Sequence, residues 1–248
     1  MTAPAAERDA TAAVAAGSAC LAYVHSNEVA HSWHLSVVGA LGYDMTHAQR
    51  LIRGGFLAMR YATGGIVEAR NTATARFLEG DAEWLWWLDT DMGFAEDTLD
   101  RLIAAADPAE RPIVGALCFA QQEYAPDGMG GYRTRPRPTL YRWAEVGDGR
   151  QGFTAWLDYP RDELVEVAAT GSACLVIHRS VFVAVGERYG PTWYSRMANP
   201  TTGQLLSEDL SFCARAVQCG YPVYVDTRVK TSHLKQVWLS EADYVGDL

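Results

Sequence analysis

The sequence lacks an excess of positive charge, because 21 Lys and Arg residues stand against 30 Asp and Glu residues, for a formal net charge of -9. Proteins that bind duplex nucleic acid depend on Lys and Arg side chains to neutralise phosphates. The charge balance therefore argues against nucleic acid as a general partner, although it leaves room for a local basic pocket that holds a nucleotide. The hydrophobic content of 49% is ordinary for a soluble globular protein.

Long apolar runs and paired cysteines are also missing. No segment approaches the roughly 18 consecutive apolar residues of a membrane-spanning helix, so we expect no integral membrane segment. The five cysteines are odd in number, scattered and without a C-x-x-C pair, which favours reduced thiols in a cytoplasm over a disulfide framework. Residues 1–17 carry charges where a signal peptide would be apolar. We expect them to form a flexible tail before a single domain at 18–248.

Several common catalytic motifs are absent. The sequence has no G-x-x-x-x-G-K-[ST] loop and no G-x-G-x-x-G fingerprint, so P-loop and dinucleotide-binding enzymes lack support. The stretch TGSAC at residues 170–174 departs from G-x-S-x-G, which weakens an α/β-hydrolase interpretation.

Strand-like and helix-like apolar patterns alternate along the chain. Strands are predicted at residues 20–25, 83–88, 111–119 and 221–225, with a pair of strands within 164–177. Helices are predicted at residues 28–43, 66–78, 94–106, 180–188 and 208–219. Residues 51–61 could form either a strand or a helix, and residues 120–139 read as a long surface loop. This alternation predicts an α/β fold with a mostly parallel sheet and helices on both faces.

The chain's strongly apolar segment WLWWL, at residues 84–88, ends in Asp89-Thr90-Asp91. Two nearby carboxylates repel each other unless positive charge lies between them. In open α/β sheets, ligands bind beyond the carboxyl ends of the strands, which is where this motif falls. A divalent cation shared by Asp89 and Asp91 would relieve the repulsion, and oxygen ligands suit Mg²⁺ or Mn²⁺. The alternative is that Asp91 caps the next helix and Asp89 is merely solvated.

The order of short motifs resembles the GT-A class of nucleotide-sugar-dependent glycosyltransferases, near family 2. The motifs, in order, are YVHSNE, EARNTATARFL, WWLDTDMGF, ATGSACLVIHRSVF, LSEDLSFCARAVQCGY and TSHLKQVW, within residues 18–240. Each is short and weak alone, and their order and spacing carry the resemblance. The closing SHLKQVWLSEADY is similar to bacteriophage and actinobacterial members, which extends the expected cytoplasmic location to an infected host cell.

This resemblance implies a GT-A (Rossmann-like) fold and a metal-dependent transferase that moves a sugar from a nucleoside diphosphate sugar to a hydroxyl of a protein or glycan. It implies Mn²⁺ or Mg²⁺ bound by Asp91, with Asp89 and His233. On the residues alone, His233 is equally consistent with a partly buried, hydrogen-bonded histidine. The donor-binding residues that it implies are His25, Asn27, Glu28, Arg70, Asn71, Asp89, Thr90 and Lys235. The acceptor side would include Gly171, Ser172 and Trp238.

Some of these residues have simpler alternatives. Arg70 supplies a fixed charge suited to a phosphate or a nucleobase edge, yet it could form a helix-surface ion pair with Glu68 or Glu83. Glu208 and Asp209 open a predicted helix, where carboxylates complement the helix dipole. The resemblance places the catalytic acidic motif there, and Asp209 could accept the proton of the acceptor hydroxyl. In related retaining enzymes a carboxylate near this position serves binding instead, so the stereochemical outcome stays open.

Two other functions also stay open. The first is a non-catalytic module of the same fold that binds a nucleotide sugar or a glycan. The second is a sugar nucleotidyltransferase, which would normally have a glycine-rich phosphate loop where this first strand ends in VHSNE. Residues 121–138 and 189–204 are candidate lids that could close over the donor.

Overall fold

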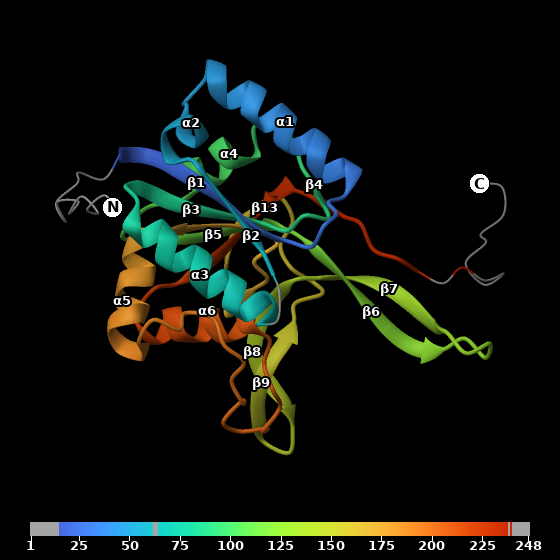
Figure 1. Cartoon of the computed structure of the whole chain (residues 1–248). Helices are drawn as coiled ribbons and strands as arrows, with labels where there is room; N and C mark the ends of the chain where they lie inside the picture. The colour runs from blue at the N-terminus through green and yellow to red at the C-terminus, as the bar shows by residue number, and fades with distance from the viewer. Residues whose placement is uncertain (1–14, 62–63, 238, 240–248) are drawn as a thin grey trace, which may run out of the picture.

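The structure is a computed structural model that describes residues 15–61, 64–237 and 239. A seven-stranded sheet in the order β10-β13-β5-β12-β3-β1-β2 forms its centre (Figure 1). In chain order these strands are β1 (Ala15–His25), β2 (Phe56–Arg60), β3 (Ala82–Leu88), β5 (Ile113–Leu117), β10 (Leu164–Val167), β12 (Cys174–His178) and β13 (Val223–Lys230). Only β10 and β12 run antiparallel to their neighbours. The predicted mostly parallel α/β sheet is confirmed.

Helices cover both faces of this sheet (Figure 1). One face carries α1 (His31–Thr46), α2 (Arg50–Gly54) and α4 (Thr98–Ala105), and the other carries α3 (Gly65–Glu79), α5 (Arg179–Tyr189) and α6 (Glu208–Gln218). Helix α1 begins three residues later than predicted. Just before it, the backbone N–H of Ala30 donates to the Thr90 carbonyl at 2.8 Å. Within the described residues, no helix combines the length and apolar character needed to cross a bilayer.

Strand β3 is apolar from Trp84 to Leu88 because both of its faces are buried there. Trp84, Trp86 and Leu88 pack in the core beneath α1, α2 and α4, whereas Leu85 and Trp87 pack in the core beneath α3, α5 and α6. All five are at most 3% exposed. A central strand between two helical layers reads as a continuous apolar run rather than an alternating one. Burying each large side chain stabilises the fold by about 1.5–3 kcal/mol or more.

The ambiguous segment 51–61 contains both kinds of element, with α2 ending and β2 beginning around Gly54 and Gly55. A Cβ at Gly54 would lie 2.2 Å from the Ala19 carbonyl oxygen, so only glycine permits this approach to β1. Gly55 has a φ of 78°, which favours glycine as well. Strand β1 itself begins at Ala15, inside the segment predicted as a tail.

The prediction of a long surface loop at residues 120–139 was wrong. This segment forms a hairpin of β6 (Phe119–Pro126) and β7 (Tyr132–Pro138), which projects from the body of the molecule (Figure 1). The Asp127 carboxylate accepts the N–H groups of Met129 and Gly131 and so closes the turn. Three further short ladders complete the fold. They are β8 (Leu140–Gly147) with β9 (Arg150–Ala155), β11 (Ala169–Thr170) with β8, and β4 (Met92–Gly93) with β14 (Ser232–His233).

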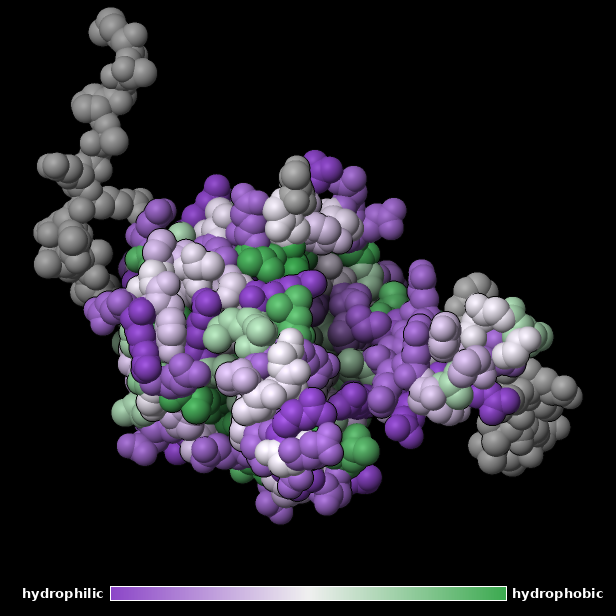
Figure 2. All heavy atoms as spheres, turned by 90° about the horizontal axis from the view of Figure 1, so that it is seen from below, coloured by the Kyte–Doolittle hydropathy of each residue, from purple (hydrophilic) through white to green (hydrophobic). Residues whose placement is uncertain are grey.

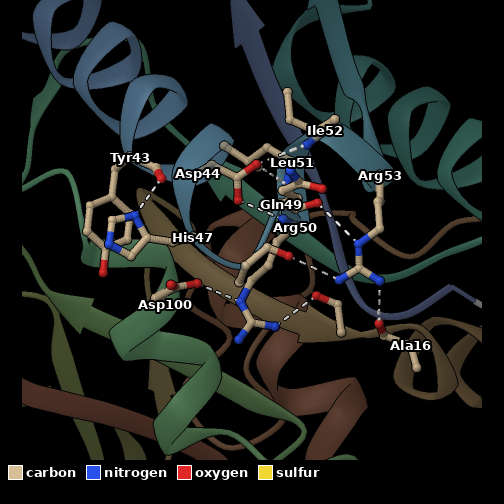
Figure 3. Close-up of polar contacts among 12 residues, drawn as sticks. Ala16, Tyr43, Asp44, His47, Gln49, Arg50, Leu51, Ile52, Arg53 and Asp100 are labelled. Atoms are coloured by element: carbon tan, nitrogen blue, oxygen red, sulfur yellow. Dashed lines mark hydrogen bonds and ion pairs between the residues drawn. The ribbon is translucent and has the colours of Figure 1, made fainter.

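A buried carboxylate fixes the connection between α1 and α2 (Figure 3). Asp44, 5% exposed, accepts the backbone N–H groups of Arg50, Leu51 and Ile52 at 2.6, 3.0 and 3.1 Å. These are orphan donors at a helix start, which a capping carboxylate satisfies. Arg50 then binds Asp100 at 2.6 Å and so connects α2 to α4. Asp44 therefore holds together the helical layer beside the start of β1.

We expect Asp44→Ala to lower the free energy of unfolding by about 1–3 kcal/mol, because three buried or half-buried donors lose their acceptor. Urea unfolding would measure this loss. Asp100→Ala is the matched control, since it breaks only a partly exposed ion pair of about 1 kcal/mol or less. Equal losses in the two variants would contradict the capping role.

Candidate active site

Two distant segments meet at the carboxyl end of β3. Asp89 and Asp91 follow that strand, and β4, directly after them, pairs antiparallel with β14 so that Met92 lies opposite His233. The backbone N–H of Leu234 also donates to the Asp91 carbonyl at 2.9 Å. This ladder brings the His233 Nε2 atom to 2.8 Å from Asp91 Oδ1. The structure thus brings together the three residues predicted as metal ligands.

The donor set of this cluster fits a divalent cation. One ligand atom each from Asp89, Asp91 and His233 lies within 4.8 Å of the others. The Nδ1 atom of His233 is 2.8 Å from the Phe119 carbonyl, which can only accept, so Nδ1 carries the proton. The Nε2 atom donates to Asp91 in this structure, and a cation would take the place of that proton on the Nε2 lone pair, the arrangement typical of metal-binding histidines. Two carboxylates and one imidazole suit Mn²⁺ or Mg²⁺.

Asp91 is kept ionised by its neighbours. Partial burial would raise the pKa of its carboxyl group, but hydrogen bonds from His233 and Lys235 outweigh this and hold the pKa at about 2. The Lys235 Nζ atom lies 2.7 Å from Asp91 Oδ2. Asp91 therefore presents a full negative charge at neutral pH, as a cation ligand must.

A buried arginine connects this cluster to a second acidic group. Arg70, on α3, is 2% exposed, and its guanidinium lies 3.2 Å from Asp89, 3.7 Å from Asp209 and 4.0 Å from Glu208. It also stacks over the Trp87 ring, with its Cζ atom 4.9 Å from the ring centre. Burial would lower the pKa of Arg70, but the surrounding carboxylates raise it, so the guanidinium stays charged.

This position contradicts the alternative of a surface ion pair for Arg70, whereas its donor-binding role stays a prediction. Arg70 does not project into solvent, and it forms no surface pair with Glu68 or Glu83. Instead it lies between Asp89 and the start of α6, and it separates like charges that would otherwise repel. We therefore describe Arg70 as a positioning residue for the carboxylates on either side of it.

Glu208 and Asp209 differ in exposure although they are adjacent. Ser207 caps α6 by accepting the Leu210 N–H, which places both carboxylates in the first turn. The Glu208 side chain is 10% exposed, and burial together with the charge of Asp209 raises its pKa. The Asp209 side chain is 20% exposed. Of the two, Asp209 has the more accessible carboxylate.

Asp209 faces the predicted acceptor side. A Cβ at Gly171 would lie 3.9 Å from Asp209 Oδ2, so the absence of a side chain there leaves room in front of the carboxylate. Asp209 Oδ1 is buried and accepts no hydrogen bond from the described residues. Ser172 is only 1% exposed and so belongs to the wall of the site rather than to its surface.

The side chain of Asn71, which was predicted to bind the donor, contacts the protein backbone instead. Its amide donates to the Tyr194 carbonyl and accepts the Tyr194 N–H, both at 2.8 Å, so the side chain holds a backbone segment rather than reaching a donor. That segment belongs to the candidate lid at 189–204. Tyr194 is fully buried and stacks on Phe212 with ring centres 4.7 Å apart. This part of the segment is anchored in the core, which contradicts a freely closing lid.

The remaining predicted residues lie around the same edge of the sheet. His25 is half-buried at the end of β1, and Asn27 and Glu28 are exposed just after it. Thr90 contacts the segment after β1 through its carbonyl, which binds Ala30. Trp238 lies outside the described residues. No sequence pattern points to the Phe119 carbonyl that orients His233, because any residue supplies a carbonyl.

Comparisons with known proteins identify the fold. No protein-family profile and no curated protein matches the sequence. A crystal structure of GalNAc-T7 with UDP, GalNAc and Mn²⁺ superposes with a TM-score of 0.55 at 13% identity, over 89% of this chain and 44% of that one. The crystal structure of A197 from STIV superposes with a TM-score of 0.51 at 17% identity, over 88% of this chain and 86% of that one. The fold is GT-A-like.

At these identities the likeness establishes the GT-A-like fold and nothing more. The chain spans less than half the length of the GalNAc-T7 structure that it matches. Chemistry must therefore be argued from the residues of this site. Asp89 and Asp91 follow the carboxyl end of β3, and His25 ends β1 beside it, which is where ligands bind in open α/β folds.

We expect Arg70→Met to lower the free energy of unfolding by about 3–5 kcal/mol at neutral pH, because it leaves buried carboxylates without their cation. Burial already raises the pKa of Asp89 and Glu208, and losing Arg70 removes an opposing effect on both. Protonation relieves the repulsion, so the deficit of the variant should shrink as the pH falls from 8 to 5. Urea unfolding at both pH values measures it, and a deficit that does not change with pH would contradict this account.

Proposed function

We propose that this chain is a divalent-metal-dependent glycosyltransferase that moves a sugar from a nucleoside diphosphate sugar to an acceptor hydroxyl. The observation that carries the proposal is the cluster of Asp89, Asp91 and His233, joined through buried Arg70 to Asp209. A cation site and a second carboxylate on the acceptor side are what such a transfer requires. The GT-A-like fold supports the proposal, as does the presence of UDP, GalNAc and Mn²⁺ in the GalNAc-T7 structure.

Asp91, Asp89 and His233 would hold the cation. When bound, it supplies positive charge that stabilises the diphosphate leaving group as the glycosidic bond breaks. The chain provides the orientation of that site, because the Phe119 carbonyl fixes the His233 ring and the β4–β14 ladder fixes its distance from Asp91. Lys235, whose side chain is 36% exposed, adds a second positive charge beside the same carboxylate. We assign Lys235 to the donor diphosphate.

The donor would lie along the carboxyl edge of the sheet. His25, Asn27 and Glu28 follow β1, and Thr90 follows β3, so all four line the same edge as Asp91. Their exposed or half-exposed polar groups are suited to hydrogen bonds with a nucleoside. Arg70 and Asn71 are left out of this set, since Arg70 is buried and bonds Asp89, and the Asn71 amide bonds the Tyr194 backbone.

Asp209 would accept the proton of the acceptor hydroxyl. A general base must lie within hydrogen-bond distance of the proton that it removes. The Asp209 carboxylate faces the space left by Gly171, so a hydroxyl placed there could reach Oδ2 directly. Arg70 holds this carboxylate from the protein side, which fixes its position without occupying the acceptor space.

We expect Mn²⁺ together with the correct nucleoside diphosphate sugar to raise the melting temperature by about 5 °C or more at saturation, since a ligand at 100 times its Kd adds about 2.7 kcal/mol. Asp91→Asn should abolish the shift, because the cluster loses a charged ligand. A panel of nucleotide sugars with Mn²⁺ or EDTA, followed by thermal unfolding, measures it. Asp148→Asn, at a carboxylate that is 89% exposed, is the control and should behave as the wild type. A shift that ignores both metal and Asp91 would refute the proposal.

We expect Asp209→Asn to reduce sugar transfer or donor hydrolysis by about 10²–10⁴-fold, the usual size of a general-base contribution. Donor affinity should change less than about twofold, because Asp209 lies on the acceptor side. Rates and donor binding measured on the same preparation separate the two effects. Donor binding without turnover in the wild type would instead favour a non-catalytic binding module of the same fold.

A further inference from the structure

The projecting hairpin carries a row of positive charge on one face. Arg133, Arg135 and Arg137 alternate along β7, and alternate residues of a strand point to the same face. Their cross-strand partners on β6 are Ala125, Gln122 and Ala120. The row therefore contains three arginines, and no carboxylate lies opposite them.

These charges are not compensated by the rest of the described chain. None of the three guanidinium groups has a carboxylate of the described residues within ion-pair distance. Exposed Arg142 and Arg150, by contrast, pair with Asp158 and Asp148. In a chain of net charge -9, an uncompensated cationic row marks a surface for an anionic partner.

The row begins at the acceptor side of the site. The Arg137 guanidinium lies 5.9 Å from the centre of the Tyr141 ring. Thr139, which follows β7, is 3.9 Å from the position that a Cβ on Gly171 would take. The row thus leads outward from Asp209 along the hairpin.

The shape of the molecule agrees with this direction. Figure 1 shows the β6–β7 hairpin extending away from the central sheet. Viewed from below, the surface is hollowed between the body and the hairpin, and hydrophilic side chains predominate around that recess (Figure 2). An extended partner lying along the hairpin would run towards the body of the molecule (Figure 1).

We propose that the arginine row binds the acceptor, and that this acceptor is an extended, acidic polypeptide segment. That the bound peptide is the sugar acceptor rests on the proposed function, whereas binding of an acidic peptide to the arginine row does not. Alternate arginines on β7 repeat about every 6.6–6.8 Å, the same repeat as alternate side chains of an extended peptide. A peptide with Asp or Glu at every second position would match the row, and guanidinium groups pair with carboxylates through two hydrogen bonds.

The test is fluorescence anisotropy with a labelled peptide of alternating Glu and Ser residues and its Gln-for-Glu analogue, without metal or donor. We expect the acidic peptide to bind at least about tenfold more tightly than the analogue at about 50 mM NaCl, and to lose this advantage at about 500 mM. The combined variant Arg133→Gln, Arg135→Gln and Arg137→Gln should remove the advantage, and Arg135→Gln alone should reduce it. Thermal unfolding and Mn²⁺ binding should remain those of the wild type.

A matched control removes three arginines from other elements, namely Arg76, Arg150 and Arg161, each changed to Gln, and should bind the acidic peptide as the wild type does. Equal binding of the two peptides, or equal loss in both combined variants, would overturn the proposal. Tighter binding of an oligothymidylate of equal charge would also overturn it, in favour of nucleic acid. If the peptide binds as expected while Asp91→Asn leaves donor binding unchanged, the proposed function is refuted and the proposal that the arginine row binds an acidic peptide is retained.

Discussion

The rest of the site depends on the contacts between the buried guanidinium of Arg70 and three carboxylates. Removing an arginine from water is costly, and such a charge is tolerated only where carboxylates surround it. Asp89, Asp209 and Glu208 supply them from the end of β3 and the start of α6. The same contacts let carboxylates with different proposed roles lie close together around one positive charge. Arg70 thereby couples the cation site to the acceptor side, since moving it would change both.

The second constraint is the short ladder between β4 and β14. It is only two residues long in each strand, yet it fixes His233 against Asp91. Phe119, at the base of the β6–β7 hairpin, orients the same imidazole through its carbonyl. The hairpin, the cation cluster and the segment after β13 are therefore in contact with one another, and a displacement of any one of them would move the His233 ring relative to Asp91.

The likeness to solved structures shows the fold, and the chemistry rests on the residues of the site. The fold is GT-A-like at an identity that carries no information about substrates, and one fold can host many reactions. What favours transfer over binding alone is the pairing of a cation cluster with the Asp209 carboxylate, whose Oδ2 atom lies 3.9 Å from the position of a Cβ at Gly171. Arginines that continue from that point along β7 then suggest how one acceptor is distinguished from another.

The sheet and its two helical layers could be predicted from the sequence, because the continuous apolar run of β3 and the helical spacing of apolar residues in α3 and α6 reflect which faces are buried. The sequence also pointed to Asp89 and Asp91, whose charge after an apolar strand is unusual at the level of sequence alone. Residues 120–139 were mistaken for a loop, since Gly and Pro content outweighed a pairing that only the Asp127 turn completes. The tertiary structure alone decided that Arg70 is internal, that Asn71 holds Tyr194 and that His233 faces Asp91. These contacts join residues far apart in the chain, and no local pattern encodes which distant partner a side chain will meet.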